Sequence, residues 1–133
     1  MLRLLLILTT ATHFATISVS PNLWYSVVIT TGTVFSILWH AGLDSFFWLD
    51  HITALIWTLS EFTLIPIEDW LLLVALDAIL LLVNWSIPTN SWSHAAWHLA
   101  HAFKTWWLAA YFMHSRRPMH RLLLEPHREN SQY

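Results

Sequence analysis

Residues 36–50 read Ser-Ile-Leu-Trp-His-Ala-Gly-Leu-Asp-Ser-Phe-Phe-Trp-Leu-Asp. One apolar segment ends within this stretch, Gly42 and Asp44 follow it, and a second apolar segment begins near Trp48. Gly and Asp are typical of turns, because Gly tolerates positive φ angles and Asp can hydrogen-bond to nearby backbone groups. The stretch therefore predicts a hairpin of two apolar helices with polar side chains on both sides of its turn.

The composition extends this interpretation to the whole chain. The 133 residues are 56% hydrophobic and 11% charged, and ten of them are Trp. Soluble domains contain about 25% charged residues, and the length suits one domain. We therefore expect an all-α fold, an integral membrane helical bundle in contact with the lipid bilayer.

The same composition excludes other classes of function. The net charge is −2, and no basic patch is interleaved with aromatic residues, so no nucleic-acid partner is expected. The chain has no Cys, which excludes disulfides, thiolate ligands and a thiol nucleophile. Any metal site must therefore use His and carboxylate side chains.

About five transmembrane helices are expected, separated by turns rich in Pro, Gly, Asp and Asn. A span needs about 20 predominantly apolar residues. A signal peptide is the alternative for the first segment, but Pro21 directly follows the region where cleavage would occur. Asn90, Ser91 or Ser93 is expected to cap the last helix. The predicted spans cover residues 3–20, 22–42, 48–65, 69–87 and 92–113, which form one domain of residues 1–113.

The Arg residues set the expected orientation. Four of them lie in residues 114–133, and only Arg3 precedes the first span. Because basic residues favour the cytosolic side, residues 114–133 are expected to form a polar cytosolic tail. Five spans then place the N-terminus on the non-cytosolic side. An endomembrane or the plasma membrane is the expected location.

Polar residues recur on single helical faces. Ser36 and His40 are four residues apart, and His94, His98 and His101 follow an i, i+4, i+7 stripe, so each set shares one face. With five spans, His40, Asp50, His94 and His98 all lie near the non-cytosolic face. Lys104 continues the stripe, and we expect it to snorkel toward the membrane surface.

The remaining polar residues have simpler interpretations. Asp50 and Glu61 are eleven residues apart, and Asp77 and Asn84 are seven apart, so each pair lies on nearly one helical face. Glu61, Asp77 and Asn84 are interpreted as hydrogen-bonding residues between helices or as residues near the cytosolic half, and a proton relay is the alternative. A packing role is expected for His13, His51 and His101, although the sequence leaves open whether His101 replaces a metal ligand.

Three imidazoles with one open coordination position form a catalytic Zn²⁺ site. His40, His94 and His98 fit the ligands, and their nitrogens should then converge within roughly 3–4 Å of one another. Asp50 fits a general base or an orienting carboxylate. Ser36 can orient water or help to stabilise an oxyanion. The cofactor expected from these residues is Zn²⁺.

The combination of Ser36-x-x-x-His40, Leu49-Asp50 and His94-Ala-Ala-Trp-His98 resembles the motif set of the CREST superfamily. This group includes alkaline ceramidases, progestin and adipoQ receptors and myomaker-like membrane hydrolases. The His-x-x-Trp-His form of residues 94–98 is similar to the ceramidase and myomaker-like branches. The resemblance covers about a third of the chain. It implies a zinc-dependent hydrolase that acts on an amide or ester bond of a membrane lipid.

The chain departs from that family in length. The family has a seven-helix bundle, whereas the 44 residues between Asp50 and His94 leave room for one intervening helix. A shortened member could complete its bundle as a homo-oligomer. The alternative is a non-catalytic multi-pass membrane protein that acts through helix–helix or partner contacts.

Overall fold

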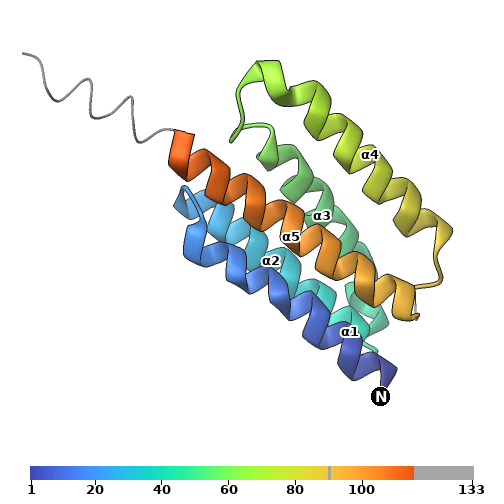
Figure 1. Cartoon of the computed structure of the whole chain (residues 1–133). Coiled ribbons are helices and arrows are strands. Elements are labelled where there is room, and N and C mark those ends of the chain that lie inside the picture. The colour runs from blue at the N-terminus through green and yellow to red at the C-terminus, as the bar shows by residue number, and fades with distance from the viewer. Residues whose placement is uncertain (90, 116–133) are drawn as a thin grey trace, which may run out of the picture.

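The computed structural model describes residues 1–89 and 91–115, and within them the side chains up to residue 111. These residues form a bundle of α-helices joined by short turns (Figure 1), and no strand occurs among them. The prediction of an all-α fold is confirmed. The helices are α1 (Leu2–Ala11), α2 (Leu23–His40), α3 (Phe47–Glu61), α4 (Trp70–Ser86) and α5 (Trp92–Ser115).

Three 3₁₀ segments complete the chain path. The segment η1 (Thr12–Val19) continues α1 without a break, so residues 2–19 form one rod. The segments η2 (Asp44–Phe46) and η3 (Ile67–Asp69) lead into α3 and α4. The five α-helices thus overlap the ranges where spans were expected. Helices α1 and α3 each begin one residue earlier than expected, and α5 continues two residues past residue 113. Most of the expected tail, residues 116–133, lies outside the described residues.

Local chemistry explains where the helices begin and end. The Asn22 side chain accepts a hydrogen bond of 2.8 Å from the backbone N–H of Tyr25 and caps α2. Ser91 Oγ accepts one of 3.1 Å from the N–H of His94, so the predicted cap of the last helix is Ser91. Asn90, the other candidate before it, lies outside the described residues. After α2, Gly42 adopts a φ of 99°, which favours Gly because it has no Cβ.

The central helices pack through small and aromatic residues. Helix α2 packs on α3, where a Cβ added to Gly32 would lie 3.3 Å from the Trp57 ring. Helix α5 packs on α1 and η1. The buried apolar core comes from several of these elements and includes Tyr25, Val28, Ile29, Trp57, Leu64, Leu73, Leu108 and Ala109.

Helix α4 lies at the edge of the bundle (Figure 1). It contacts mainly α5 and η3. Apart from Leu73, its large apolar side chains are mostly exposed, including Leu71, Leu82 and Trp85. This helix is therefore attached to the bundle by few contacts among the described residues.

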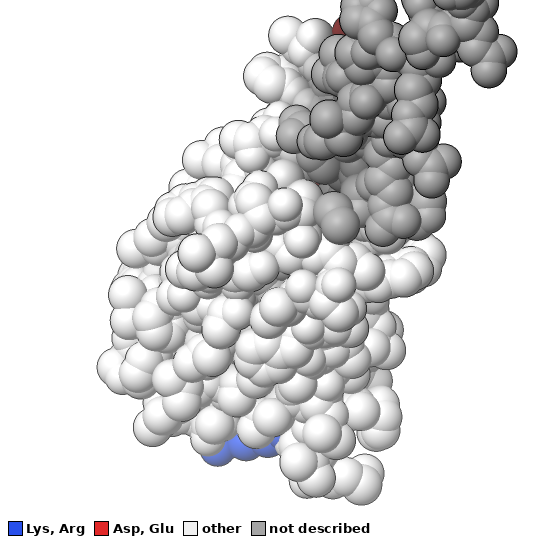
Figure 2. Space-filling model, turned by 90° about the vertical axis from the view of Figure 1, so that its left-hand side faces the viewer, with Lys and Arg blue, Asp and Glu red and all other residues white. Residues whose placement is uncertain are grey.

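Two described segments are long and apolar enough to cross a membrane, Leu2–Val19 and Leu23–His40. Helices α3 and α4 have 15 and 17 residues, which is shorter than the ~20 of an ordinary span. Helix α5 has 24 residues, but its His stripe and Lys104 lower its hydropathy. One face of the molecule is nevertheless almost free of charged side chains among the described residues (Figure 2).

Candidate metal centre

Three buried histidines converge where α2 ends and α5 begins. His40 is the last residue of α2, and His94 and His98 lie in the first two turns of α5. One ligand nitrogen from each ring lies within 4.8 Å of the other two. The Nε2 atoms of His40 and His98 are 2.9 Å apart. The sequence therefore selected three residues that do come together and that could hold a metal ion.

The local sequence explains this convergence. The Ser91 cap fixes the first turn of α5, so that His94 and His98 point from consecutive turns toward the end of α2. The rings of His94 and His98 lie edge to face, with centroids 4.7 Å apart, and His40 meets His94 in the same way at 5.3 Å. The three rings form a compact group rather than three separate packing contacts.

The hydrogen bonding of His94 fits a metal ligand. Both of its ring nitrogens are buried, and neither has a hydrogen-bond partner within the part of the chain that the structure describes. A buried polar group without a partner is costly. A metal ion bound through one nitrogen would satisfy that nitrogen. Ligand nitrogens at about 2.0–2.1 Å from one zinc ion require the His94 ring to move slightly inward from the present separation.

Asp50 and Ser36 lie together on the two helices of the opening hairpin. The Ser36 hydroxyl lies near the Asp50 carboxyl. Ser36 is buried, and the Asp50 side chain is only 15% exposed. The next residue, His51, lies on the surface, with Nδ1 bonded to the Phe47 carbonyl and 3.8 Å from the Asp50 carboxylate. Asp50 is thus held near the same end of the bundle as His40, which is four residues after Ser36.

His101 is paired with another histidine and is not part of the three-histidine group. Its Nδ1 lies 3.0 Å from Nε2 of His13, and Nδ1 of His13 lies 2.8 Å from the Thr10 carbonyl oxygen. Because a carbonyl can only accept, His13 donates from Nδ1. In the neutral pair, His101 then donates to His13. The question left open by the sequence is resolved, since His101 serves to join α5 to η1.

The sequence prediction for Lys104 is wrong. Lys104 does not snorkel, because it is 7% exposed and its Nζ lies 2.5 Å from Glu61 Oε2 and 2.5 Å from Asp77 Oδ1. Its position on the same α5 stripe as the histidines is the signal that it faces the bundle interior. The carboxylate partners come from α3 and α4, and sequence spacing within one helix does not reveal them.

Comparisons with known proteins return no relative: no family model, curated protein or solved structure matches the chain. The geometry of the residues is therefore the basis for the functional argument.

Proposed function

We propose that the chain is a membrane-embedded, zinc-dependent hydrolase of lipid amide or ester bonds, with a site similar to those of the ceramidase-like and phospholipase-like CREST members. One observation carries the proposal: three buried histidines from two helices bring their ligand nitrogens within 4.8 Å of one another. Imidazole is a ligand that zinc prefers, and three with an open position is the arrangement of a catalytic site.

His40, His94 and His98 would hold the ion. Zinc bound by three histidines supplies an activated water near neutral pH. Asp50 is the one carboxylate near this end of the bundle that the structure describes as partly buried. It would accept a proton from the attacking water and return it to the leaving nitrogen or oxygen.

Ser36 would hold the Asp50 carboxyl in place. Its hydroxyl lies near that carboxyl, one turn before His40 on α2. A carboxylate held by a hydroxyl keeps one orientation, which favours proton transfer along one direction.

A lipid substrate is favoured by the surface around the site. Many large apolar side chains are exposed, among them Trp48, Leu49 and Ile52 near the start of α3 and Trp92 at the start of α5. In a bilayer such side chains contact lipid. We propose a multi-pass topology with the site near the non-cytosolic face and the C-terminus in the cytosol.

Metal analysis of the detergent-purified chain tests the proposal first. We expect about one equivalent of zinc per chain, lost in His98→Ala and kept in His51→Ala, whose ring lies on the surface. If the purified chain contains no zinc, or if His98→Ala does not lower its zinc content, the proposed metal centre is contradicted. Release of fatty acid from short-chain ceramide or phospholipid, lost in Asp50→Asn, then tests hydrolysis.

The alternative is a non-catalytic membrane protein that acts through helix contacts, and the exposed apolar face of α4 favours it. The two functions predict different outcomes for the same variants. If His40→Ala and Asp50→Asn leave both the function and the stability unchanged, the alternative is supported and hydrolysis is excluded.

A further inference from the structure

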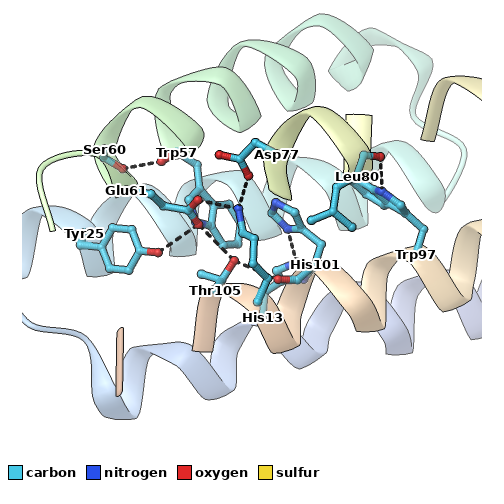
Figure 3. A network of polar contacts seen from close by, with 11 residues as sticks. His13, Tyr25, Trp57, Ser60, Glu61, Asp77, Leu80, Trp97, His101 and Thr105 are labelled. Carbon is cyan, nitrogen blue, oxygen red and sulfur yellow. Dashed lines mark hydrogen bonds and ion pairs between the residues drawn. The ribbon is translucent and has the colours of Figure 1, made fainter. Parts of the chain in front are cut away.

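A second group of ionisable side chains lies in the interior, apart from the three-histidine group. Glu61 is the last residue of α3, Asp77 lies in the middle of α4, and Lys104 lies in α5. The Lys104 ammonium contacts one oxygen of each carboxylate at 2.5 Å, and the Asp77 side chain is 16% exposed, whereas Glu61 and Lys104 are buried. In Figure 3 the dashed lines from Glu61 and Asp77 meet at one nitrogen atom. We call these three residues the acid–lysine cluster. The proposed hydrolysis uses none of them.

The two acids of the cluster have different surroundings. Glu61 is completely buried, and its Oε1 accepts hydrogen bonds of 3.3 Å from the Tyr25 and Thr105 hydroxyls. With Lys104 on Oε2, both oxygens of Glu61 have partners. Asp77 has Lys104 on Oδ1, whereas its Oδ2 is buried and has no hydrogen-bond partner among residues 1–89 and 91–111. One oxygen of the cluster is therefore open.

The charges of the cluster do not balance. Two carboxylates and one ammonium leave a net charge of −1. The other titratable groups that face it are Tyr25 from α2, His101 from α5 and His13 from η1. A phenol adds no positive charge, and the two imidazoles bond to each other as a neutral pair. Among the described residues the other cation is Arg3, which is exposed. A buried charge without a counter-charge is costly.

We propose that the acid–lysine cluster is a proton-binding site, in which Glu61 and Asp77 share one proton while Lys104 remains charged. The proton comes from solvent and forms an O–H bond with one carboxyl oxygen, for which Asp77 Oδ2 is open. The cluster is then neutral. Ionisable residues in the interior of membrane bundles commonly mark proton and ion sites.

Proton binding at this site also affects α4. The contact between Lys104 and Asp77 is one of the few that tie α4 to α5, together with a hydrogen bond of 2.8 Å from Trp97 Nε1 to the Leu80 carbonyl. Protonation of Asp77 weakens the ion pair between Lys104 and Asp77, and loss of that proton restores the ion pair. The attachment of α4 is therefore expected to depend on occupancy of the site.

Infrared spectroscopy of the full-length chain in detergent tests the proposal. The protein is measured at neutral pH after treatment with a chelator, in an Asp50→Asn background, so neither the metal centre nor Asp50 contributes. We expect the C=O stretching band of a protonated carboxylic acid. The band should be lost in Glu61→Gln and in Asp77→Asn, because either change leaves one carboxylate to balance Lys104.

Matched controls come from exposed acids. Glu68→Gln and Asp44→Asn make the same chemical changes on the surface, and both should keep the band. Absence of the band in the parent protein, or its persistence in both Glu61→Gln and Asp77→Asn, would overturn the proposal. A band that sodium chloride removes and choline chloride does not would assign the site to Na⁺ instead of a proton. None of these outcomes depends on hydrolase activity.

Discussion

His40 and His98 meet through their Nε2 atoms, 2.9 Å apart, between the end of α2 and the second turn of α5. Two imidazole nitrogens at this distance cannot both present lone pairs to each other, so one must carry a proton or both must bind a cation. His94 stands beside them, and both of its nitrogens lack a partner within the described residues. A shared metal ion accounts for all three rings together.

Loss of His94 should therefore weaken zinc binding strongly. Changing outer residues around a zinc site typically lowers affinity about 10–100-fold, and loss of a direct ligand should exceed this. We expect His94→Ala to reduce zinc affinity more than about 100-fold, as measured by competition with a chromophoric chelator. His51→Ala is the control, and equal affinities in the two variants would exclude His94 as a ligand.

Zinc affinity should fall with decreasing pH. The ligands bind as neutral imidazoles, so protons compete with the metal. We expect zinc affinity to be lost progressively as the pH is lowered from neutral into the acid range. Each ligand imidazole can bind one proton that competes with zinc. Since His94→Ala removes one of these imidazoles, its zinc affinity should depend less steeply on pH than that of the wild type. Affinity independent of pH would argue against histidine ligands.

Much of this site was accessible from the sequence because helical spacing is regular. The four-residue intervals of Ser36 with His40 and of His94 with His98 place each pair on one face, and the three histidines do converge. The all-α fold followed from the apolar segments and the turns between them. The shared faces and the helices depend on local periodicity, which a single sequence displays. The expectation that His40 meets His94 and His98 from another helix rested on the count of spans and on the resemblance to the CREST motif set.

The acid–lysine cluster was not accessible in the same way. Glu61, Asp77 and Lys104 come from three helices, and their contacts depend on how α3, α4 and α5 rotate against one another. The expectation that Lys104 reaches the membrane surface considered the Lys104 side chain alone, without the carboxylates that approach it in the folded bundle. A buried ammonium is stable only when carboxylates approach it, and those partners are a property of the tertiary packing.

Asp50→Asn should separate catalysis from metal binding. The amide keeps the size of the side chain but cannot accept a proton in the reaction, and general-base catalysis contributes typically about 10²–10⁴-fold. We expect lipid hydrolysis to fall by a factor in that range while the zinc content stays near that of the wild type. Parallel loss of zinc would show instead that Asp50 maintains the structure of the centre.

Lys104→Ala should destabilise the bundle. It leaves the buried Glu61 carboxyl and the partly buried Asp77 carboxyl without their common counter-ion, and breaking a buried ion pair costs about 3–5 kcal/mol. Unfolding in detergent should report a decrease of that size in the free energy of unfolding. The neutral triple variant Lys104→Met, Glu61→Gln, Asp77→Asn should recover much of it. A change within about 0.5 kcal/mol for Lys104→Ala, as is usual at surface sites, would contradict the buried pairing.

Gly32 tests how closely α2 and α3 pack. A Cβ at this position would lie 3.3 Å from Cε3 of Trp57 and 3.6 Å from Oγ1 of Thr53. Gly32→Ala should change stability little, because the gain of about 1 kcal/mol in helix propensity offsets a small shift of the Trp57 ring. Gly32→Leu cannot be accommodated, and overpacking should cost about 1–3 kcal/mol. Thermal unfolding, followed by circular dichroism, measures the stability of both variants. Equal stability of Gly32→Ala and Gly32→Leu would mean that α2 and α3 do not pack closely at this position.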